Sequence, residues 1–386
     1  MRRLLILLAI LPLTAQAQIG RLGENVRYGA SMSGMASSGD YAPFWFTANR
    51  YGLATPNNES FLTRAFIGRS TTTDSSRHWR VGYGADFAVA AGMDNHFILQ
   101  QLYAEVQWKA LRLSVGQKQR KLELLNDSLS SGAMTTGINT RPLPQVRLEL
   151  PDFWAVPGTH RWLALKAHFA MGAYTDNGWQ RSSTKTHSLP YTNNSLYHSK
   201  ELLLRIGNRE RFPLTLTGGL EMSTQFGGEG WNMGQRLDDG TVLSSHRKLF
   251  HGLSSIWHAI IPGGGDEDDG DFANAEGNML GSWHLRADWQ GKGWSAAAYL
   301  EHYFEDESQL FWQYGWKDFL LGVEVSLPRN PFLSSVLYEH LGTMDQSGPV
   351  YHDSRENLPV QISAIDEYYN HHVYGAWQHA GYVMGN

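Results

Sequence analysis

Apolar and polar residues alternate with a period of two along much of this chain. The pattern is clearest from residue 102 to 116, where the apolar positions are Leu102, Ala104, Val106, Trp108, Leu111, Leu113 and Val115. The intervening positions carry Tyr103, Glu105, Gln107, Lys109, Arg112 and Ser114. Side chains of a β-strand point alternately to two faces, so the pattern predicts two strands with one apolar and one polar face each. The short break around Ala110 leaves room only for a tight hairpin turn.

The same alternation recurs in about 14 segments of about ten residues, the length of a tilted strand that crosses a membrane. Short turns are predicted at residues 73–77, 109–111, 153–159, 208–211, 290–293 and 328–331. Long connections are predicted at residues 117–143, 174–197, 226–278 and 342–368. Short turns on one side and long loops on the other are typical of an outer-membrane barrel.

Charged residues recur on one parity in strand after strand, as a wet barrel interior requires. A soluble lipocalin-like barrel or a sandwich would instead turn its apolar face inward. The predicted fold is therefore all-β, a transmembrane antiparallel β-barrel. Five tryptophans near the short turns are expected to form an aromatic girdle at the periplasmic interface: Trp79, Trp108, Trp162, Trp289 and Trp294. A last candidate strand covers residues 369–382 and the chain stops in mid-pattern, so we expect the strands that close the barrel to be missing.

The N-terminus has the pattern of a secretory signal peptide. Arg2 and Arg3 precede an apolar run at residues 4–13 and the small-residue cleavage site Ala15-Gln16-Ala17. The run is shorter than the roughly 20 apolar residues of a membrane-spanning helix. We expect a signal peptide at residues 1–17, a barrel at residues 18–386 and a location in the cell outer membrane.

Composition removes several classes of function. A formal net charge of −5 argues against a nucleic-acid partner. The absence of cysteine excludes disulfides, thiolate metal sites, cysteine nucleophiles and a lipoprotein anchor. Glycine (40 residues) and aromatic residues (12%) are abundant, which fits a β-rich chain with many turns.

Several blocks depart from the alternation. They are PFWFTANRYG at 43–52, GQKQRKLELLNDSLSSG at 116–132, RPLPQV at 141–146, YEHLGTMDQSGPVYHD at 338–353 and DEYYNHHVYGAWQHAGYVMGN at 366–386. Together they resemble the Wzi-like capsule assembly proteins of Gram-negative outer membranes, over nearly the whole mature chain. The residues that carry the resemblance include Pro43, Phe44, Trp45, Asn49, Arg50, Tyr51, Gly52, Gln346, Ser347, Gly348, Tyr368, Tyr369, Asn370 and His371.

The resemblance implies an 18-stranded barrel that holds capsular polysaccharide at the cell surface, as a lectin-like protein and not as an enzyme. Better-known members carry a periplasmic helical bundle before the barrel, and residues 18–25 leave no room for one. The implied partners are capsular polysaccharide and outer-membrane lipid, with a monomeric state and no cofactor. The alternative function is an outer-membrane porin or a polysaccharide export channel. An enzyme such as a lipase is disfavoured, because no Ser/His/acid arrangement with recognisable spacing is present.

Candidate polysaccharide-binding residues follow from chemistry. Aromatic faces stack on sugar C–H groups, and arginine pairs with uronic carboxylates through two parallel hydrogen bonds. The candidates are Lys118, Arg120, Lys121, Arg141, Trp179, Trp231, Trp257 and Trp312. The competing and favoured interpretation is that the loop tryptophans pack the loops over the barrel mouth. For residues 43–52, an inward-folded structural segment is favoured over a binding site.

The acidic run at residues 263–271 has two interpretations. Calcium takes six to eight oxygen ligands and can sit among such carboxylates. A solvated loop is the favoured interpretation. The 16 histidines show no HExxH or other metal-binding spacing, so no metal site is predicted.

Overall fold

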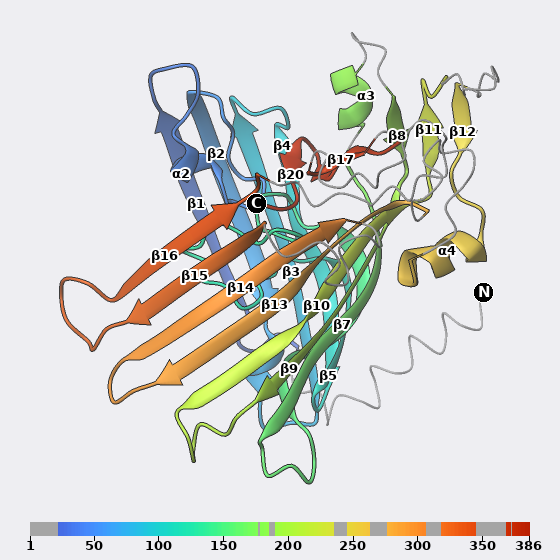
Figure 1. Ribbon diagram of the computed structural model, residues 1–386. Helices are drawn as coiled ribbons and strands as arrows, with labels where there is room; N and C mark the ends of the chain where they lie inside the picture. Colours follow the sequence, from blue (N-terminus) through green and yellow to red (C-terminus); the bar gives the residue numbers. More distant parts are fainter. Residues whose placement is uncertain are drawn as a thin grey trace.

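The computed structural model is dominated by one large antiparallel sheet (Figure 1). The structure describes residues 22–176, 178–184, 190–234, 245–262, 276–305, 318–344, 368–371 and 373–386. The predicted signal peptide, Trp312, the acidic run 263–271 and Gln346, Ser347 and Gly348 lie outside these residues.

The large sheet has 13 strands, and each pairs with the next one along the chain. They are β1 (Arg27–Ala36), β2 (Glu59–Arg69), β3 (Trp79–Ala91), β4 (Phe97–Trp108), β5 (Leu111–Gln117), β6 (Pro144–Ala155), β7 (Leu163–Ala173), β9 (Leu196–Ile206), β10 (Leu214–Phe226), β13 (Asn278–Gln290), β14 (Ser295–Glu305), β15 (Phe319–Ser326) and β16 (Ser335–Gly342). The sheet curls into a trough (Figure 1), and within the described residues its edge strands β1 and β16 do not pair with each other. These 13 strands match the predicted series of about 14 except for the last predicted strand, at residues 369–382, which is not part of the large sheet.

The β4–β5 hairpin confirms the prediction made from its alternation. Trp108 pairs with Leu111, so Lys109 and Ala110 form a two-residue turn. The apolar face points out of the trough, with Leu102 52% exposed. The polar face points inward, with Glu105 only 3% exposed. The same division holds on neighbouring strands, so the outside of the wall is apolar and the inside is polar.

The connections alternate as predicted. The turn end of the sheet carries the short connections, and the loop end carries the longer ones apart from the short link at residues 92–96 between β3 and β4 (Figure 1). The five tryptophans of the predicted girdle lie at the turn end and are each 39% to 45% exposed. Trp79 and Trp108 are paired across β3 and β4, with ring centroids 6.2 Å apart.

Inward-pointing charges form ion pairs, as the common parity of the charges predicts. Arg64 of β2 pairs with Asp86 of β3 at 2.5 Å, and within β13 Arg286 pairs with Asp288 at 3.0 Å. These contacts neutralise charges that the curled sheet removes from bulk water.

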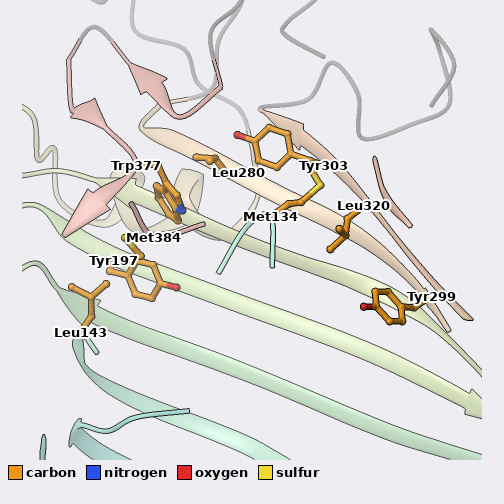
Figure 2. Packing of buried hydrophobic residues seen from close by; sticks show 9 residues of the cluster. All are labelled: Met134, Leu143, Tyr197, Leu280, Tyr299, Tyr303, Leu320, Trp377 and Met384. Atoms are coloured by element: carbon orange, nitrogen blue, oxygen red, sulfur yellow. The ribbon is translucent and has the colours of Figure 1, made fainter. Parts of the chain in front are cut away.

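Two segments fold into the trough and give it a core. The lumen segment (residues 118–143) joins β5 to β6, and the C-terminal hairpins are β17 (Asn370–His371) with β18 (Gly375–Ala376) and β19 (Gln378–His379) with β20 (Tyr382–Val383). Figure 2 shows the buried cluster in which they meet the wall: Met134, Leu143, Tyr197, Leu280, Tyr299, Tyr303, Leu320, Trp377 and Met384. The predicted long strand over residues 369–382 is therefore wrong. Positive φ angles at Gly375 (79°) and Gly381 (87°) bend the chain into two short hairpins there.

The loop end carries the smaller elements. They are the helices α2 (Phe44–Thr47), α3 (Trp179–Thr184) and α4 (Leu253–Ile260) and a sheet of β8 (Tyr191–Asn193), β11 (Glu229–Trp231) and β12 (His246–Lys248). A short 3-10 helix, η1 (Thr71–Asp74), lies at the turn end. Among the described helices, none has the length and apolar character to cross a membrane.

Candidate functional site

The lumen segment is fixed to the inner wall by polar contacts with strands on the far side of the trough. Glu339 of β16 accepts hydrogen bonds from the Ser130 hydroxyl and the Ser131 amide, each 2.7 Å long. Glu301 of β14 accepts one from the Met134 amide at 2.9 Å. Buried polar groups require such partners, so these carboxylates hold the segment in one position.

The first of the blocks that carry the resemblance, residues 43–52, divides into two halves. Asn49 donates from its side chain to the carbonyls of Ser130 (3.2 Å) and Ser131 (2.9 Å). The Tyr51 hydroxyl donates to the Arg120 carbonyl at 2.9 Å. This half is the inward-docked structural segment that was predicted. The other half is α2, where Phe44 and Trp45 are exposed.

Gly52 explains why the docked half requires glycine. Its φ is 68°, and a Cβ atom added there would lie 2.9 Å from the Arg141 nitrogen. Its amide donates to the Asn139 carbonyl at 2.6 Å. A side chain at this position would both strain the backbone and separate the two segments.

The C-terminal residues fix the other side of the lumen segment. The indole of Trp377 is fully buried and donates to the Thr135 carbonyl at 2.8 Å. The Gly137 amide donates to the Met384 carbonyl at 2.6 Å. Tyr369, from the last resemblance block, donates to the Met134 carbonyl at 2.5 Å.

A cavity of about 80 Å³ lies between the lumen segment and strands β6, β9 and β10. Its lining holds four basic groups and one carboxylate: Lys118, Arg120, Arg141, Arg147 and Glu221. We call it the cationic cavity. It has room for a carboxylate group.

Arg120 has no carboxylate contact of its own within the described part of the chain. Its guanidinium donates to the Ser114 hydroxyl and the Lys118 carbonyl, both at 3.1 Å. Burial and the nearby charge of Arg147 lower the pKa of Arg120 to about 10, against the opposing charge of Glu149. Arg120 therefore stays protonated at neutral pH, but its charge is poorly compensated.

The other basic groups are partly compensated. Lys118 forms an ion pair with Glu105, and Arg147 donates to Glu149 at 2.7 Å. Burial lowers the pKa of Lys118, while Glu105 acts in the opposite direction. The lining thus keeps an excess of positive charge.

Arg141 lies where the cavity meets the C-terminal hairpins. Its guanidinium donates to the Thr175 carbonyl at 3.2 Å, and its Nε has no hydrogen-bond partner within the described residues. Burial lowers its pKa. The neighbouring His379 contacts the Arg141 carbonyl at 3.0 Å through Nδ1, and its Nε2 accepts from the Thr175 amide at 3.4 Å. This arrangement suits a neutral imidazole.

The structure thus brings Lys118, Arg120 and Arg141 together, as three of the eight predicted binding residues. Lys121 points away: its side chain is 87% exposed and lies 3.3 Å from Asp127. Sequence reasoning missed Arg147 as a site residue. Its inward parity on β6 was visible, but the approach of the lumen segment to that strand was not.

The described loop tryptophans lie apart from the cationic cavity. Trp231 stacks on His246 with ring centroids 3.9 Å apart, within the small loop-end sheet. Trp179 packs against the turn at Gly381 in the C-terminal hairpins. Both pack the loops, as the favoured interpretation predicts. Trp257 is 57% exposed on α4.

Three further residues of the resemblance, Tyr368, His371 and Arg50, make contacts within the fold. The Tyr368 ring lies 4.9 Å from that of Tyr303, and its hydroxyl donates to Asp318. His371 Nδ1 accepts from the Val373 amide at 3.1 Å, and Arg50 donates to the Trp45 carbonyl at 3.0 Å. Across the described part of the chain, no three His, Asp or Glu side chains are placed to bind a metal ion together.

No family model and no curated protein matches this chain. Among solved structures it is similar to Wzi of Escherichia coli, described as an outer-membrane carbohydrate-binding β-barrel involved in group 1 capsule assembly, with 14% identity and a TM-score of 0.52. That match covers 99% of this chain and 66% of Wzi, so the chain spans just under two thirds of its length. Weaker likenesses are to Salmonella typhi OmpF in complex with daunomycin (9% identity, TM-score 0.32, 82% of this chain and 90% of that one) and to a mutant porin of Rh. blastica (8%, 0.29, 81% and 97%). The likeness to Wzi and the outward apolar wall identify the fold as that of an outer-membrane antiparallel β-barrel.

Proposed function

We propose that this chain belongs to an outer-membrane protein that binds an acidic capsular or extracellular polysaccharide and attaches or assembles it at the cell surface, without catalysing a reaction. The observation that carries the proposal is the cationic cavity, where Lys118, Arg120, Arg141 and Arg147 meet one carboxylate, Glu221. An anion from outside would balance this charge excess.

The chemistry of the lining decides which part of a sugar enters the cavity. Arg120 and Arg141 both line it, and guanidinium groups pair well with carboxylates. The proposed ligand therefore places the carboxylate of a uronic acid between Arg120 and Arg141. A hydrogen bond between an arginine and a carboxylate contributes about 1.5–3 kcal/mol, which corresponds to about 10- to 100-fold in affinity.

The fold is consistent with this proposal, since Wzi is described as a carbohydrate-binding barrel of capsule assembly. Fold alone does not determine function, so the cavity carries the proposal. The filled trough also supports a binding protein over a porin or an export channel. The lumen segment and Trp377 pack into a buried cluster where an open pore would hold water.

The test compares Arg120→Gln and Arg141→Gln with the matched control Lys121→Gln, which changes an exposed cation of the same segment. We expect wild-type protein to bind immobilised polygalacturonate and not dextran, and each arginine variant to bind about 10-fold more weakly or worse. Lys121→Gln should bind like wild type.

Two results would contradict the proposal. One is equal binding of polygalacturonate by both arginine variants and the wild type. The other is a large, steady conductance of the wild type in planar bilayers without sugar binding, which would instead support the channel. Circular dichroism and the heat-modified mobility of the barrel on gels verify that each variant is folded.

A further inference from the structure

Helix α4 lies on the outside of the barrel wall, unlike the lumen segment (Figure 1). Thr224 of β10 is on the outward parity with Leu216 and donates to the Ala259 carbonyl of α4 at 3.2 Å. Lys200 of β9, on the outward parity with Leu202, donates to the Ile260 carbonyl. A cation at the last carbonyls of a helix also interacts favourably with its dipole.

The orientation of α4 is fixed by its buried side. Ser255 and Ala259 are buried, and Glu276 accepts hydrogen bonds from Ser255 and from His258 Nδ1, the latter at 2.6 Å. The opposite side exposes Leu253 (83%), Trp257 (57%) and Ile261 (47%). These three residues are spaced by four and form one apolar stripe along the helix.

The height of α4 on the wall follows from strand geometry. Leu214 of β10 pairs with Trp289 of the turn-end girdle, and Thr224 lies ten residues further along β10. Ten residues rise about 34 Å along a strand, and a tilt of 35–45° reduces this to about 24–28 Å across the membrane. The apolar band of such barrels is about 25 Å tall, so α4 lies at the opposite interface from the girdle.

The wall next to α4 is hollowed. A groove of about 710 Å³ runs over the outward face of β9, β10 and β13, and Lys200 lines it where it meets the helix. The side chain missing at Gly218 helps to form it, between Leu216 and Leu220. The groove extends the apolar surface from the barrel wall to α4, with room for lipid chains.

We propose that α4 is an interfacial membrane helix: its Leu253–Trp257–Ile261 stripe lies in the outer leaflet, above acyl chains that fill the groove. Tryptophan is enriched at this depth because its ring is both apolar and polar. Trp257 then contacts lipid and not polysaccharide. The inference rests on the membrane-spanning fold and is independent of sugar binding.

The test uses the absence of cysteine, because each single-cysteine variant then carries one spin label. The full chain is placed in vesicles of phosphatidylcholine and phosphatidylglycerol, with labels at Leu253→Cys, Trp257→Cys and Ile261→Cys. Ser254→Cys is the matched control on an exposed, polar position of the same helix. Collision rates with oxygen and with a water-soluble nickel chelate report the depth of each label.

We expect the three stripe labels at a depth of about 5–10 Å and the Ser254 label in water. A label at Leu216→Cys should lie deeper still, which verifies insertion of the wall. Stripe labels as accessible to nickel as the Ser254 label, with the Leu216 label deep, would overturn the inference. Three other results would also overturn the inference. They are dipolar broadening between the stripe labels of two copies, protection of the stripe labels from nickel only when polygalacturonate is added, and a shallow label at Leu216.

Discussion

Replacing Trp377 by alanine should release the lumen segment from the C-terminal hairpins and leave the wall folded. The Trp377 side chain is fully buried, and its indole is the donor to the Thr135 carbonyl. Truncating a buried tryptophan costs about 3–5 kcal/mol, and an unsatisfied buried carbonyl about 1–3 kcal/mol. Because water can enter the opened site, we expect about 4 kcal/mol, or about a thousandfold in the local opening equilibrium.

Hydrogen exchange followed by mass spectrometry measures this opening. The reporter is the peptide around residues 133–140, whose Gly137 amide is bonded to the Met384 carbonyl. Its exchange should accelerate about a thousandfold in Trp377→Ala. In Trp377→Phe, which mainly loses the hydrogen bond, about tenfold is expected. Peptides of β4 and β5 should be unchanged. Equal exchange of the reporter in wild type and Trp377→Ala would refute the role assigned to this contact.

Two further predictions concern pH and the lipid-facing wall. Burial, reinforced by the charge of Arg141, lowers the pKa of His379 to about 4, below the roughly 6.5 of an exposed histidine. As the pH falls, His379 is protonated first in the undocked hairpins, where its pKa is about 6.5. The docked hairpins are therefore most stable above pH 6.5, and they lose about 3 kcal/mol of stability relative to the undocked state as the pH falls towards 4. Exchange of the reporter peptide, corrected for intrinsic rates, should show this loss in the wild type but not in His379→Gln, and identical pH profiles would contradict it. Val115 points outward at 51% exposure near the middle of the wall, so Val115→Arg should lower the free energy of unfolding in vesicles by about 2–4 kcal/mol, measured by guanidinium titration. Val115→Leu is the control, and a tolerated arginine would mean that this face does not meet lipid.

Much of the wall could be predicted from sequence because each strand carries its own signal. The alternation of Leu113 with Arg112 and Ser114 is decided by neighbours one residue apart, and the turn at Lys109 follows from the break in that pattern. The inward charges and the tryptophan girdle follow from the same parity. These features require no knowledge of distant parts of the chain.

The interior of the trough could not be predicted in the same way. Residues 369–382 alternate like a strand, yet Trp377 and His379 are buried among partners that are distant in sequence. Arg141 comes close to Arg147 because hydrogen bonds to Glu339 and Glu301 hold the lumen segment against the wall. No local pattern in the sequence predicts these hydrogen bonds. The sequence therefore indicated three of the basic residues, but not the cavity that they line.

The docking of the lumen segment has a consequence for the order of folding. Asn139 donates to the Gly385 carbonyl, 246 positions later in the chain, while the neighbouring wall hairpins close over a few residues. Contacts between distant positions form slowly, because the entropy of closing so long a loop opposes them until both ends are in place. The docking of the lumen segment against the C-terminal hairpins is consequently expected to be a late kinetic step in the folding of the barrel, after the local hairpins of the wall have formed.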